Sequence, residues 1–311
     1  MKERLLEFLG CPDCRGTLDL KADVVEDAEI KEGSLLCKKC NKSFLINDFI
    51  PRFVETDRYV DSFSFEWNVF HDVQIDILNN TSESEDTFKY KTRFRKEDVK
   101  GKVFLDAGIG AGRFAEVVSR WGGEVIGFDL SFAVEAAYKN IGKRQNVHIV
   151  QADIFKPPFK GEAFDHMYSI GVLHHTPDAR KAFESLIPFL KKGGAFAVFI
   201  YERGIYHRYS DLWRKVTVKL PLRVMYIISA IAIPLYYIHK IPFLGAALQF
   251  AFPTANWQKW RWRWLDTFDW YTPKYQWKHT YPEVYRWYKE NGFQNMELFD
   301  YPVCIKGVKA D

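Results

Sequence analysis

The stretch KVFLDAGIGAGRF, residues 102–114, decides the fold of this 311-residue chain. Apolar residues suited to a buried strand lead into three closely spaced glycines, Gly108, Gly110 and Gly112, and a helical pattern begins after them. Glycine lacks a Cβ atom, so the backbone can turn sharply there and a ligand can come close to the N-terminus of the next helix. The stretch therefore predicts a strand, a ligand-binding turn and a helix, although a tight turn without a ligand would use the same glycines.

The next strand-like stretch, EVIGFDLS at residues 124–131, places an acidic residue where a nucleotide ribose would lie. Asp129 follows Gly108 by 21 positions, and a carboxylate there is suited to accept hydrogen bonds from ribose hydroxyls. The spacing G-x-G-x-G differs from the G-x-G-x-x-G that cradles a pyrophosphate, and no Lys-Ser or Lys-Thr pair follows to mark a phosphate-binding loop. The sequence therefore favours an adenosine cofactor other than a dinucleotide.

Three more apolar stretches follow, separated by helical segments. HIVQADIF at residues 148–155 predicts a third strand, and FDHMYSIGVLHHTPD at residues 164–178 predicts a fourth. LKKGGAFAVFIYE at residues 190–202 predicts a helix end followed by a fifth strand. Apolar strands that alternate with helices form a parallel sheet covered on both faces. We therefore predict an α/β fold with a Rossmann-like, doubly wound and mostly parallel sheet.

Taken in order, these stretches closely resemble the class I S-adenosylmethionine-dependent methyltransferases. The matching features are D-x-G-x-G-x-G at residues 106–112, the acidic strand end at Asp129, AD-I at residues 152–154, VLHH at residues 172–175 and L-K-x-GG before the fifth strand. The resemblance covers about residues 100–202, and the tail to residue 311 fits the family's final helix and strand pair. It implies a methyltransferase with S-adenosyl-L-methionine as its cofactor.

The same resemblance implies which residues hold the cofactor. Gly108 and Gly110 would face its methionine part, and Asp129 would hold the ribose. Asp153 and Ile154 would flank the adenine. The full set that we expect at the cofactor is Asp106, Gly108, Gly110, Gly112, Asp129, Leu130, Asp153, Ile154 and Ile170.

A pair of histidines, His174 and His175, stands where the fourth strand should end. Ligands of doubly wound folds lie at that edge of the sheet, and in some small-molecule methyltransferases of this family a histidine in such an LHH serves as a base. We therefore expect a catalytic role for the pair, although one histidine could instead point into the core or cap the loop before Thr176. The sequence SIGVLHH lacks the Asn/Asp-Pro-Pro-aromatic loop typical of enzymes that methylate exocyclic base nitrogens, which argues against that chemistry.

Four of the five cysteines form two C-x-x-C pairs near the N-terminus, Cys11 with Cys14 and Cys37 with Cys40. Two such knuckles supply the four sulfurs of a tetrahedral zinc site with no position open for water, so we expect a structural Zn²⁺ rather than a catalytic one or a redox dithiol. The first 55 residues resemble the zinc-ribbon domain of the tRNA-methyltransferase activator family, with a CP-x-C opening and an IP exit.

The N-terminus has no apolar run typical of a secretory signal, so a reducing, cytoplasmic setting is expected.

The chain divides into three predicted parts: a zinc ribbon at residues 1–55, a helical linker or lid at residues 56–99 and the methyltransferase domain at residues 100–311. An insertion of about 70 residues, 203–272, follows the fifth strand and should determine the acceptor. Its apolar run at residues 224–238 is shorter than the ~20 residues needed to span a bilayer and is interrupted by proline. The run therefore disfavours a spanning helix and leaves an interfacial one open.

The stretch NWQKWRWRWLDTFDW, residues 256–270, mixes aromatic and basic residues within the insertion. If it is helical, four aromatic side chains share one face: Trp257, Trp260, Trp264 and Phe268. Such a stripe packs against the core, lies on a membrane or lipid acceptor, or stacks on single-stranded nucleic acid. We expect a cap over the acceptor pocket, with peripheral membrane contact left open. The candidate acceptor residues are Trp67, Tyr201, Asp269, Tyr271 and His279.

These features predict an S-adenosylmethionine-dependent methyltransferase that acts on a small-molecule or lipid-linked acceptor, at oxygen or carbon, by direct methyl displacement. The formal net charge of +4 does not call for nucleic acid. One alternative is an RNA methyltransferase, because an rRNA guanine methyltransferase family also joins a zinc ribbon to this fold. Its ribbon usually replaces one cysteine by histidine, whereas this chain has four cysteines. The other alternative is a non-catalytic cofactor-binding or partner-docking protein.

Overall fold

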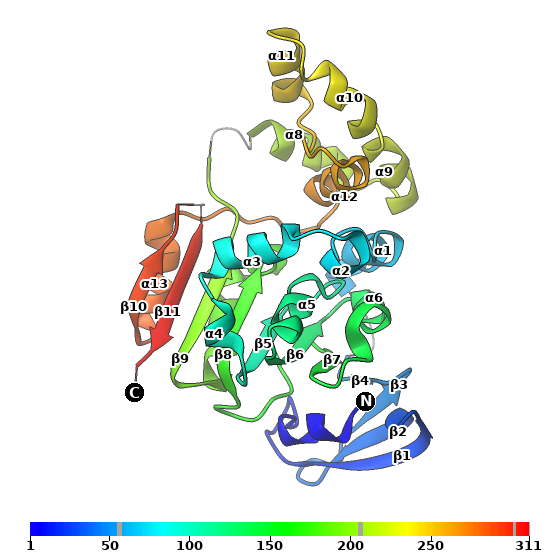
Figure 1. The fold of residues 1–311 in the computed structure, drawn as a ribbon, viewed down its shortest axis with the longest axis vertical. Helices are drawn as coiled ribbons and strands as arrows, with labels where there is room; N and C mark the ends of the chain where they lie inside the picture. Colours follow the sequence, from blue (N-terminus) through cyan, green and yellow to red (C-terminus); the bar gives the residue numbers. More distant parts are fainter. Residues whose placement is uncertain (55–57, 205–207, 301–302, 311) are drawn as a thin grey trace.

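The computed structural model describes residues 1–54, 58–204, 208–300 and 303–310. A sheet of eleven strands runs through this part of the chain in the order β1-β2-β3-β4-β7-β6-β5-β8-β9-β11-β10 (Figure 1). The first four strands belong to the N-terminal ribbon and the other seven to the central domain.

The central strands are parallel from β7 to β9, and the last two strands add an antiparallel edge. The chain runs from β5 outward to β6 and β7 and then crosses to β8 and β9 on the other side. The predicted doubly wound, mostly parallel α/β sheet is therefore confirmed. The direction in which successive strands are added to the sheet changes between β5 and β8. The bounds are β5 Val103–Ala107, β6 Glu124–Asp129, β7 Val147–Gln151, β8 Phe164–Ile170, β9 Leu190–Phe199, β10 Phe293–Leu298 and β11 Cys304–Lys309.

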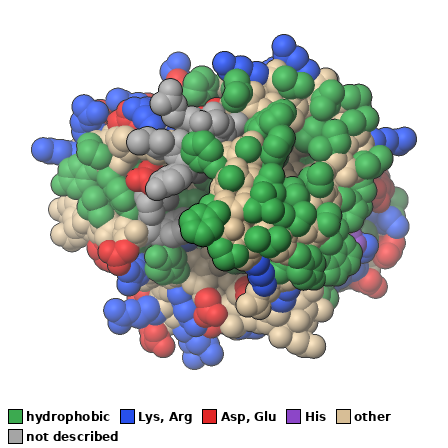
Figure 2. Space-filling view, turned by 90° about the horizontal axis from the view of Figure 1, so that it is seen from above, with side chains coloured by type: hydrophobic (Ala, Val, Ile, Leu, Met, Phe, Trp, Pro, Cys, Tyr) green, Lys and Arg blue, Asp and Glu red, His purple; other side chains and the backbone are tan. Residues whose placement is uncertain are grey.

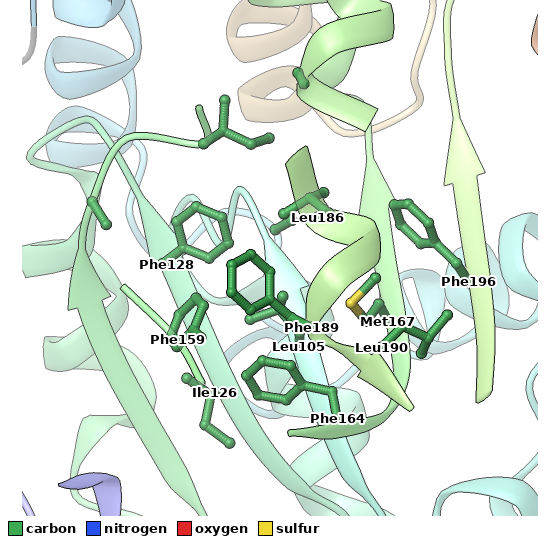
Figure 3. Packing of buried hydrophobic residues seen from close by; sticks show 14 of the residues in the cluster. Leu105, Ile126, Phe128, Phe159, Phe164, Met167, Leu186, Phe189, Leu190 and Phe196 are labelled. Atoms are coloured by element: carbon green, nitrogen blue, oxygen red, sulfur yellow. The ribbon is translucent and has the colours of Figure 1, made fainter. Parts of the chain in front are cut away.

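Helices cover both faces of the central sheet (Figure 1). α7 and α13 pack on one face in a cluster that includes Leu105, Phe128 and Phe164, which Figure 3 shows. α3, α5 and α6 pack on the other face in a cluster that includes Phe104. Phe104 and Leu105 are neighbours in β5 yet belong to opposite clusters, because successive side chains of a strand alternate between its faces. The bounds are α3 Glu83–Thr92, α5 Arg113–Arg120, α6 Ala133–Ala137, α7 Ala179–Leu186 and α13 Tyr281–Glu290.

The helix end that we expected within LKKGG is wrong. α7 ends at Leu186, a 3-10 turn covers Ile187–Phe189, and β9 already begins at Leu190. Pro188 lies in this turn and has no N–H to continue an α-helical ladder, so the helix ends earlier than the glycines suggested.

The ribbon strands form an antiparallel meander that joins the central sheet through a parallel bridge between Arg52 of β4 and Gln151 of β7. Leu5 and Phe8 at the N-terminus are buried in the same cluster as the central strands. The Arg15 guanidinium adds a hydrogen bond to the Pro157 carbonyl at 2.7 Å. The ribbon is therefore packed directly on the central domain. The bounds are η1 Glu3–Glu7, β1 Leu18–Glu26, β2 Glu29–Cys37, β3 Ser43–Asn47 and β4 Ile50–Arg52.

Short helices connect the ribbon to β5. α1 packs against α6 and α12, and α3 packs against α5 and β9. This segment therefore lies over the central domain instead of forming an extended linker. The bounds are η2 Arg58–Val60, α1 Asp61–Val69, α2 Asp76–Asn79 and α4 Lys96–Val99.

Helices α8 to α12 form a cap above the carboxyl ends of the central strands (Figure 1). α12 is its base, because it contacts α1 below and α8, α9 and α10 within the cap. Among the helices within residues 58–204 and 208–300, none has the length and apolar character needed to cross a bilayer. The bounds are α8 Arg208–Thr217, α9 Leu222–Ser229, α10 Ala232–Ile238, α11 Leu244–Ala251 and α12 Trp260–Tyr271.

The aromatic stripe expected on residues 256–270 forms only in part. Trp257 precedes α12 and is 46% exposed, whereas Phe268 is fully buried. Arg263 of the same stretch is also buried. Its guanidinium donates to two backbone carbonyls at 2.8 Å each and lies 4.0 Å above the ring of Tyr236. A planar, weakly hydrated guanidinium can stack on an aromatic ring in this way, which hydropathy alone does not predict.

Candidate active site

A cavity of about 1220 Å³ lies at the carboxyl ends of the central strands, between the sheet and the cap. Its walls come from the turn after β5, from the ends of β6, β8 and β9, and from α1, α3, α11 and α12. Ligand pockets commonly enclose about 300–1,000 Å³, so this cavity has room for a cofactor together with an acceptor. It also lies where the strand order reverses, which is where doubly wound sheets bind ligands.

The glycine turn after β5 forms one wall of the cavity. Gly108 has a φ of +93°, and a Cβ atom added there would lie 2.3 Å from the side chain of Val172. Gly110 has a φ of +51°, and its Cβ atom would lie 3.3 Å from Trp67 Nε1. The turn therefore needs glycine at both positions, and its backbone faces the cavity without side chains, as a closely bound ligand requires.

Asp129 ends β6 and lines the same cavity. Its Oδ2 atom accepts a hydrogen bond from the Gly110 N–H at 3.1 Å, and its Oδ1 atom accepts from the N–H and the hydroxyl of Ser131 at 2.9 and 2.7 Å. Burial raises the pKa of Asp129, and these hydrogen bonds oppose that rise. A carboxylate has about four lone-pair sites, so one acceptor site on Asp129 stays available for a hydroxyl group.

An apolar slot adjoins Asp129. Among the residues expected at the cofactor, Leu130, Ile154 and Ile170 line this slot, next to Phe128 and Ala152. Such a slot suits the flat face of an adenine ring.

Three residues expected at the cofactor do not line the cavity. The Asp106 carboxylate lies beneath the turn, where its Oδ2 atom accepts a hydrogen bond from the Tyr168 hydroxyl at 2.9 Å, and burial raises its pKa to about 8. Asp153 Oδ1 accepts from the Phe155 N–H at 2.9 Å. Gly112 packs against Ile141. These residues hold the turns in place from outside the cavity.

The two histidines of the LHH motif occupy different environments. His175 lines the cavity, and its Nδ1 atom lies 2.8 Å from the Tyr275 carbonyl. Because a carbonyl only accepts, Nδ1 carries the proton, and Nε2 is left as an acceptor. His174 lies behind the wall, fully buried and stacked 3.9 Å from the ring of Tyr201. Burial lowers the pKa of His175 to about 3 and that of His174 well below its usual value, so both rings are neutral.

The candidate acceptor residues separate into two groups. Trp67, Tyr201 and Asp269 line the cavity, where the Tyr201 hydroxyl donates to Asp269 Oδ2 at 3.3 Å. Tyr271 and His279 lie away from it. The Tyr271 hydroxyl donates to the backbone carbonyl of Pro253 in the cap at 2.6 Å. His279 Nδ1 lies 3.5 Å from the Glu283 carboxylate of α13.

Sequence reasoning missed Glu66, which lines the cavity from α1. Its side chain is fully buried, and within the described part of the chain neither carboxylate oxygen has a hydrogen-bond partner. Burial, and then the charges of Asp269 and Asp266, raise the pKa of Glu66 well above its usual range. The available signal was one acidic residue inside the aromatic run FSFEW.

Two cations at the cavity were also missed. The ammonium group of Lys91 lies 3.5 Å above the ring of Phe199, and burial lowers the pKa of Lys91 to about 7. Arg113 follows the glycine turn, and its guanidinium donates to Ser84 and Gln74 at 3.0 and 3.2 Å. Burial lowers the pKa of Arg113 to about 10. The cavity therefore combines an apolar slot with charged groups of both signs.

A second cluster lies in the ribbon, away from the cavity. The sulfur atoms of Cys11, Cys14, Cys37 and Cys40 all lie within 4.8 Å of one another. The Cys11–Cys40 and Cys14–Cys37 sulfur distances are 3.6 and 3.4 Å. Tetrahedral zinc with Zn–S bonds of about 2.3 Å places its sulfurs about 3.8 Å apart. The four thiols therefore fit a zinc ion closely.

Two family models match parts of the chain. Residues 105–198 match the family described as a methyltransferase domain, and residues 2–48 match the family described as Trm112p-like protein. The first match covers the glycine turn, the β6 carboxylate and the histidine pair, and the second covers the ribbon with its four cysteines.

Curated relatives resemble the central part of the chain. Phosphoethanolamine N-methyltransferase 2 of Caenorhabditis elegans is 31% identical over 120 residues, covering 37% of this chain and 27% of that protein. Sterol 24-C-methyltransferase ERG6 of Saccharomyces cerevisiae is 31% identical over 105 residues, covering 32% and 27%. A ubiquinone biosynthesis O-methyltransferase of Coxiella burnetii is 30% identical over 98 residues, covering 31% and 42%. The chain therefore spans less than half the length of the curated relatives it matches.

A solved structure shares the fold over most of the chain. It belongs to a complex between the Haloferax volcanii Trm112 methyltransferase activator and a protein described as a methyltransferase. The identity is 12%, the match covers 83% of this chain and 98% of that one, and the TM-score is 0.50. Residues 2–48 of the chain therefore match the Trm112p-like family, residues 105–198 match the methyltransferase-domain family, and the fold is shared with the solved structure.

Proposed function

We propose that this chain is an S-adenosylmethionine-dependent methyltransferase that methylates oxygen or carbon of a small-molecule or lipid-linked acceptor by direct displacement. The observation that carries this proposal is the cavity that joins the glycine turn and Asp129 to a second compartment under the cap. We also propose the division into a ribbon at residues 1–55, a lid at 56–99 and the methyltransferase domain at 100–311, and a structural zinc ion in the ribbon.

The residues around the glycine turn fit the cofactor. Gly108 and Gly110 would lie against its methionine part, Asp129 would accept from a ribose hydroxyl, and Ile154 would contact the adenine. When bound, the cofactor supplies a methyl group that its sulfonium already activates, so the protein has to align the acceptor and exclude water.

Residues of the chain carry out these two tasks. Phe63 and Trp67 of α1 and Trp262 of α12 line the cavity and would keep water away from the methyl group. His175 would orient a hydroxyl acceptor by accepting its hydrogen bond at Nε2, because its Nδ1 proton is engaged by the Tyr275 carbonyl. His174 would support this arrangement from behind, since it does not line the cavity.

An acceptor with an apolar tail suits the cap. Helix α11 lines the cavity with Ala246 and Phe250 and continues into a cap surface rich in exposed apolar side chains. Figure 2 shows this apolar surface from above. Ile227, Tyr237 and Phe243 on it are 71, 66 and 92% exposed. Soluble proteins rarely expose large contiguous apolar patches without a partner for them, so this face supports a lipid-linked acceptor.

The charge around this apolar surface favours an anionic bilayer as its partner. Lys215, Lys219, Arg223 and Lys240 are exposed on the cap, and Asp211 is the sole acidic residue in the sequence from 208 to 259. Apolar side chains surrounded by basic ones suit peripheral binding to a surface of anionic lipids.

Flotation with lipid vesicles tests the membrane contact. The protein should float with phosphatidylserine vesicles, and the double variant Ile227→Asp/Phe243→Asp should bind at least tenfold more weakly. Leu45→Asp is the matched control, because Leu45 is 67% exposed on the ribbon. Equal flotation of the wild type and the double variant would refute the contact.

Transfer of a labelled methyl group tests the function. The purified protein is incubated with methyl-labelled S-adenosylmethionine and an extract of its source cells, and lipid, polar small-molecule and RNA fractions are separated. Label should enter the lipid or small-molecule fraction, and Asp129→Ala should strongly reduce it at cofactor concentrations that do not saturate the variant. Label confined to RNA would support the RNA methyltransferase alternative instead, and cofactor binding without label in any fraction would support a non-catalytic role.

A further inference from the structure

Three carboxyl groups gather on the acceptor side of the cavity. Asp266 and Asp269 lie three residues apart on α12 and therefore face the same side of that helix. Glu66 comes from α1, which packs against α12. All three line the cavity, so two helices from distant parts of the sequence place acidic groups together there.

Two of these carboxyl groups have oxygen atoms without a hydrogen-bond donor. Neither oxygen of Glu66 has a partner within the residues that the structure describes, and the same holds for Asp269 Oδ1. Asp269 Oδ2 accepts a hydrogen bond from the Tyr201 hydroxyl at 3.3 Å. An ionised carboxylate buried without donors is strongly unfavourable. The pair therefore requires a proton or a ligand that compensates its charge.

The nearby cations compensate Asp266 better than they compensate Glu66. Arg113 and Lys91 are the cations whose charges act on Asp266. Among the described residues, the charges that act on Glu66 are those of Asp269 and then Asp266. Of these two carboxyl groups, Glu66 is therefore the one whose negative charge is less compensated by positive neighbours.

Asp269 has one further cationic neighbour, Arg214 of α8. The Arg214 guanidinium donates to the backbone carbonyls of Trp270 and Pro273, the first at 3.1 Å. Its hydrogen bonds are thus directed to the backbone and not to Asp269. The Tyr201 hydroxyl also faces Asp269 and donates to its Oδ2 atom.

We infer that Glu66 and Asp269 form a carboxyl pair that holds one proton in the free protein and gives it up when a sulfonium cation enters the cavity. This inference rests on the proposed function, because it takes S-adenosylmethionine as the cation. The negative charge of Asp269 acts on Glu66, and two carboxyl groups that interact in this way do not both ionise easily and titrate as a pair. Burial, and then the charge of Asp266, raise the pKa of Asp269 to about 7, which agrees with a shared proton near neutral pH.

The pair would also receive the proton that methylation of a hydroxyl group releases. In that reaction the S–CH₃ bond breaks with its electron pair left on sulfur, the O–CH₃ bond forms, and the acceptor loses its O–H proton. A Glu66 carboxylate oxygen would take this proton, so the cavity loses the sulfonium charge and gains a proton charge in one turnover. His175 is a weaker base for this step, because burial lowers its pKa to about 3.

Calorimetry of cofactor binding measures the proton directly. At pH 6.5, binding of S-adenosylmethionine is compared in phosphate and imidazole buffers, whose different ionisation enthalpies report the number of protons released. The neutral thioether product S-adenosylhomocysteine serves as the comparison ligand. We expect release of about one proton with the sulfonium ligand and none with the thioether, and a release that disappears by about pH 9.

Variants assign the proton to the pair. Glu66→Gln should reduce the release to a small fraction of the wild-type value, and Asp269→Asn should do the same if Glu66→Gln fails to fold. Glu202→Gln is the matched control, because Glu202 lines the cavity but is exposed. Lys91→Gln is a second control, because Lys91 also has a pKa of about 7, and release should persist in it.

Equal proton release with both ligands, or full release in folded Glu66→Gln, would refute the inference while leaving cofactor binding intact. Loss of release in Lys91→Gln, with release retained in Glu66→Gln, would assign the proton to Lys91 and refute the pair. Failure of the wild-type protein to bind either ligand would instead contradict the proposed function.

Discussion

Replacing Asp129 by alanine should weaken binding of the cofactor product S-adenosylhomocysteine by about 10- to 150-fold. The Asp129 carboxylate already accepts three hydrogen bonds, from the N–H of Gly110 and from the N–H and hydroxyl of Ser131. One acceptor site is left for a ribose hydroxyl. A hydrogen bond to a charged group contributes about 1.5–3 kcal/mol, and each ~1.4 kcal/mol is tenfold in the dissociation constant.

Two further variants separate the ribose contact from support of the turn. Asp129→Asn keeps one acceptor oxygen without the charge, so a neutral hydrogen bond of about 0.5–1.5 kcal/mol should remain and about 1–1.5 kcal/mol should be lost, which is about 5- to 12-fold in the dissociation constant. Ser131→Ala removes the hydroxyl donor to Oδ1 and keeps both the backbone N–H donor and the carboxylate, so it should change affinity by about threefold or less.

Isothermal titration calorimetry provides the dissociation constants, and thermal melting establishes that each variant is folded. A folded Asp129→Ala protein whose dissociation constant stays within about threefold of the wild type would remove Asp129 from the ribose site, because one charged hydrogen bond already accounts for about tenfold.

Three other predictions concern the ribbon, the turn and the core. Atomic absorption should find about one zinc per chain, and removing it with a chelator should lower the melting temperature, because the four cysteine sulfurs lie within 4.8 Å of one another; an unchanged melting temperature would contradict this. Gly108→Ala should abolish S-adenosylhomocysteine binding in calorimetry, because its Cβ atom would lie 2.3 Å from Val172 at a φ of +93°; wild-type affinity would show that the turn adapts. Burial raises the pKa of Asp106 from its usual 3.8 to about 8, so the folded state keeps a proton that the unfolded chain releases, and stability should fall by up to ~1.4 kcal/mol per pH unit between about pH 4 and 8. Urea titrations should show a flatter slope for Asp106→Asn, and an unchanged slope would exclude Asp106 as its cause.

The central fold could be predicted from the sequence because its signals are local. The glycines at 108, 110 and 112 and the carboxylate of Asp129 stand at fixed distances after buried strands, and the strands alternate with helices in chain order. Neighbouring strands of a doubly wound sheet follow the right-handed connection rule, so local order translates into topology. The boundary at the fifth strand was less predictable, because Pro188 ends the helix before the glycines do.

The sequence predicted most of the residues that line the cavity near the glycine turn, but it did not distinguish them from residues that support the turn from outside. Asp106 and Asp153 belong to the same motifs as their neighbours, yet their carboxylates accept hydrogen bonds from Tyr168 and from the Phe155 N–H outside the cavity. A motif specifies which residues occur together, but the direction of each side chain depends on alternation along the strand and on the turn that follows.

The acceptor side could not be predicted because its residues become neighbours only through packing. Glu66 and Asp269 are about 200 positions apart in the sequence and meet because α1 packs against α12. Both helices lie outside residues 105–198, the part that matches the methyltransferase domain. The matched region contains the glycine turn, and α1 and α12 outside it contribute Glu66 and Asp269 to the cavity wall.

The carboxyl pair has a stability cost that packing does not offset. A fully buried Glu66 without donors is less favourable than an apolar side chain of similar size, so the fold would be expected to gain stability from its replacement. Groups that cost stability and line a ligand cavity are characteristic of functional sites. If Glu66→Leu stabilises the protein and also removes proton release on S-adenosylmethionine binding, the Glu66 carboxyl group contributes to ligand binding and does not stabilise the fold. If Glu66→Leu destabilises the protein, Glu66 has a structural partner, and the carboxyl pair loses its physical basis.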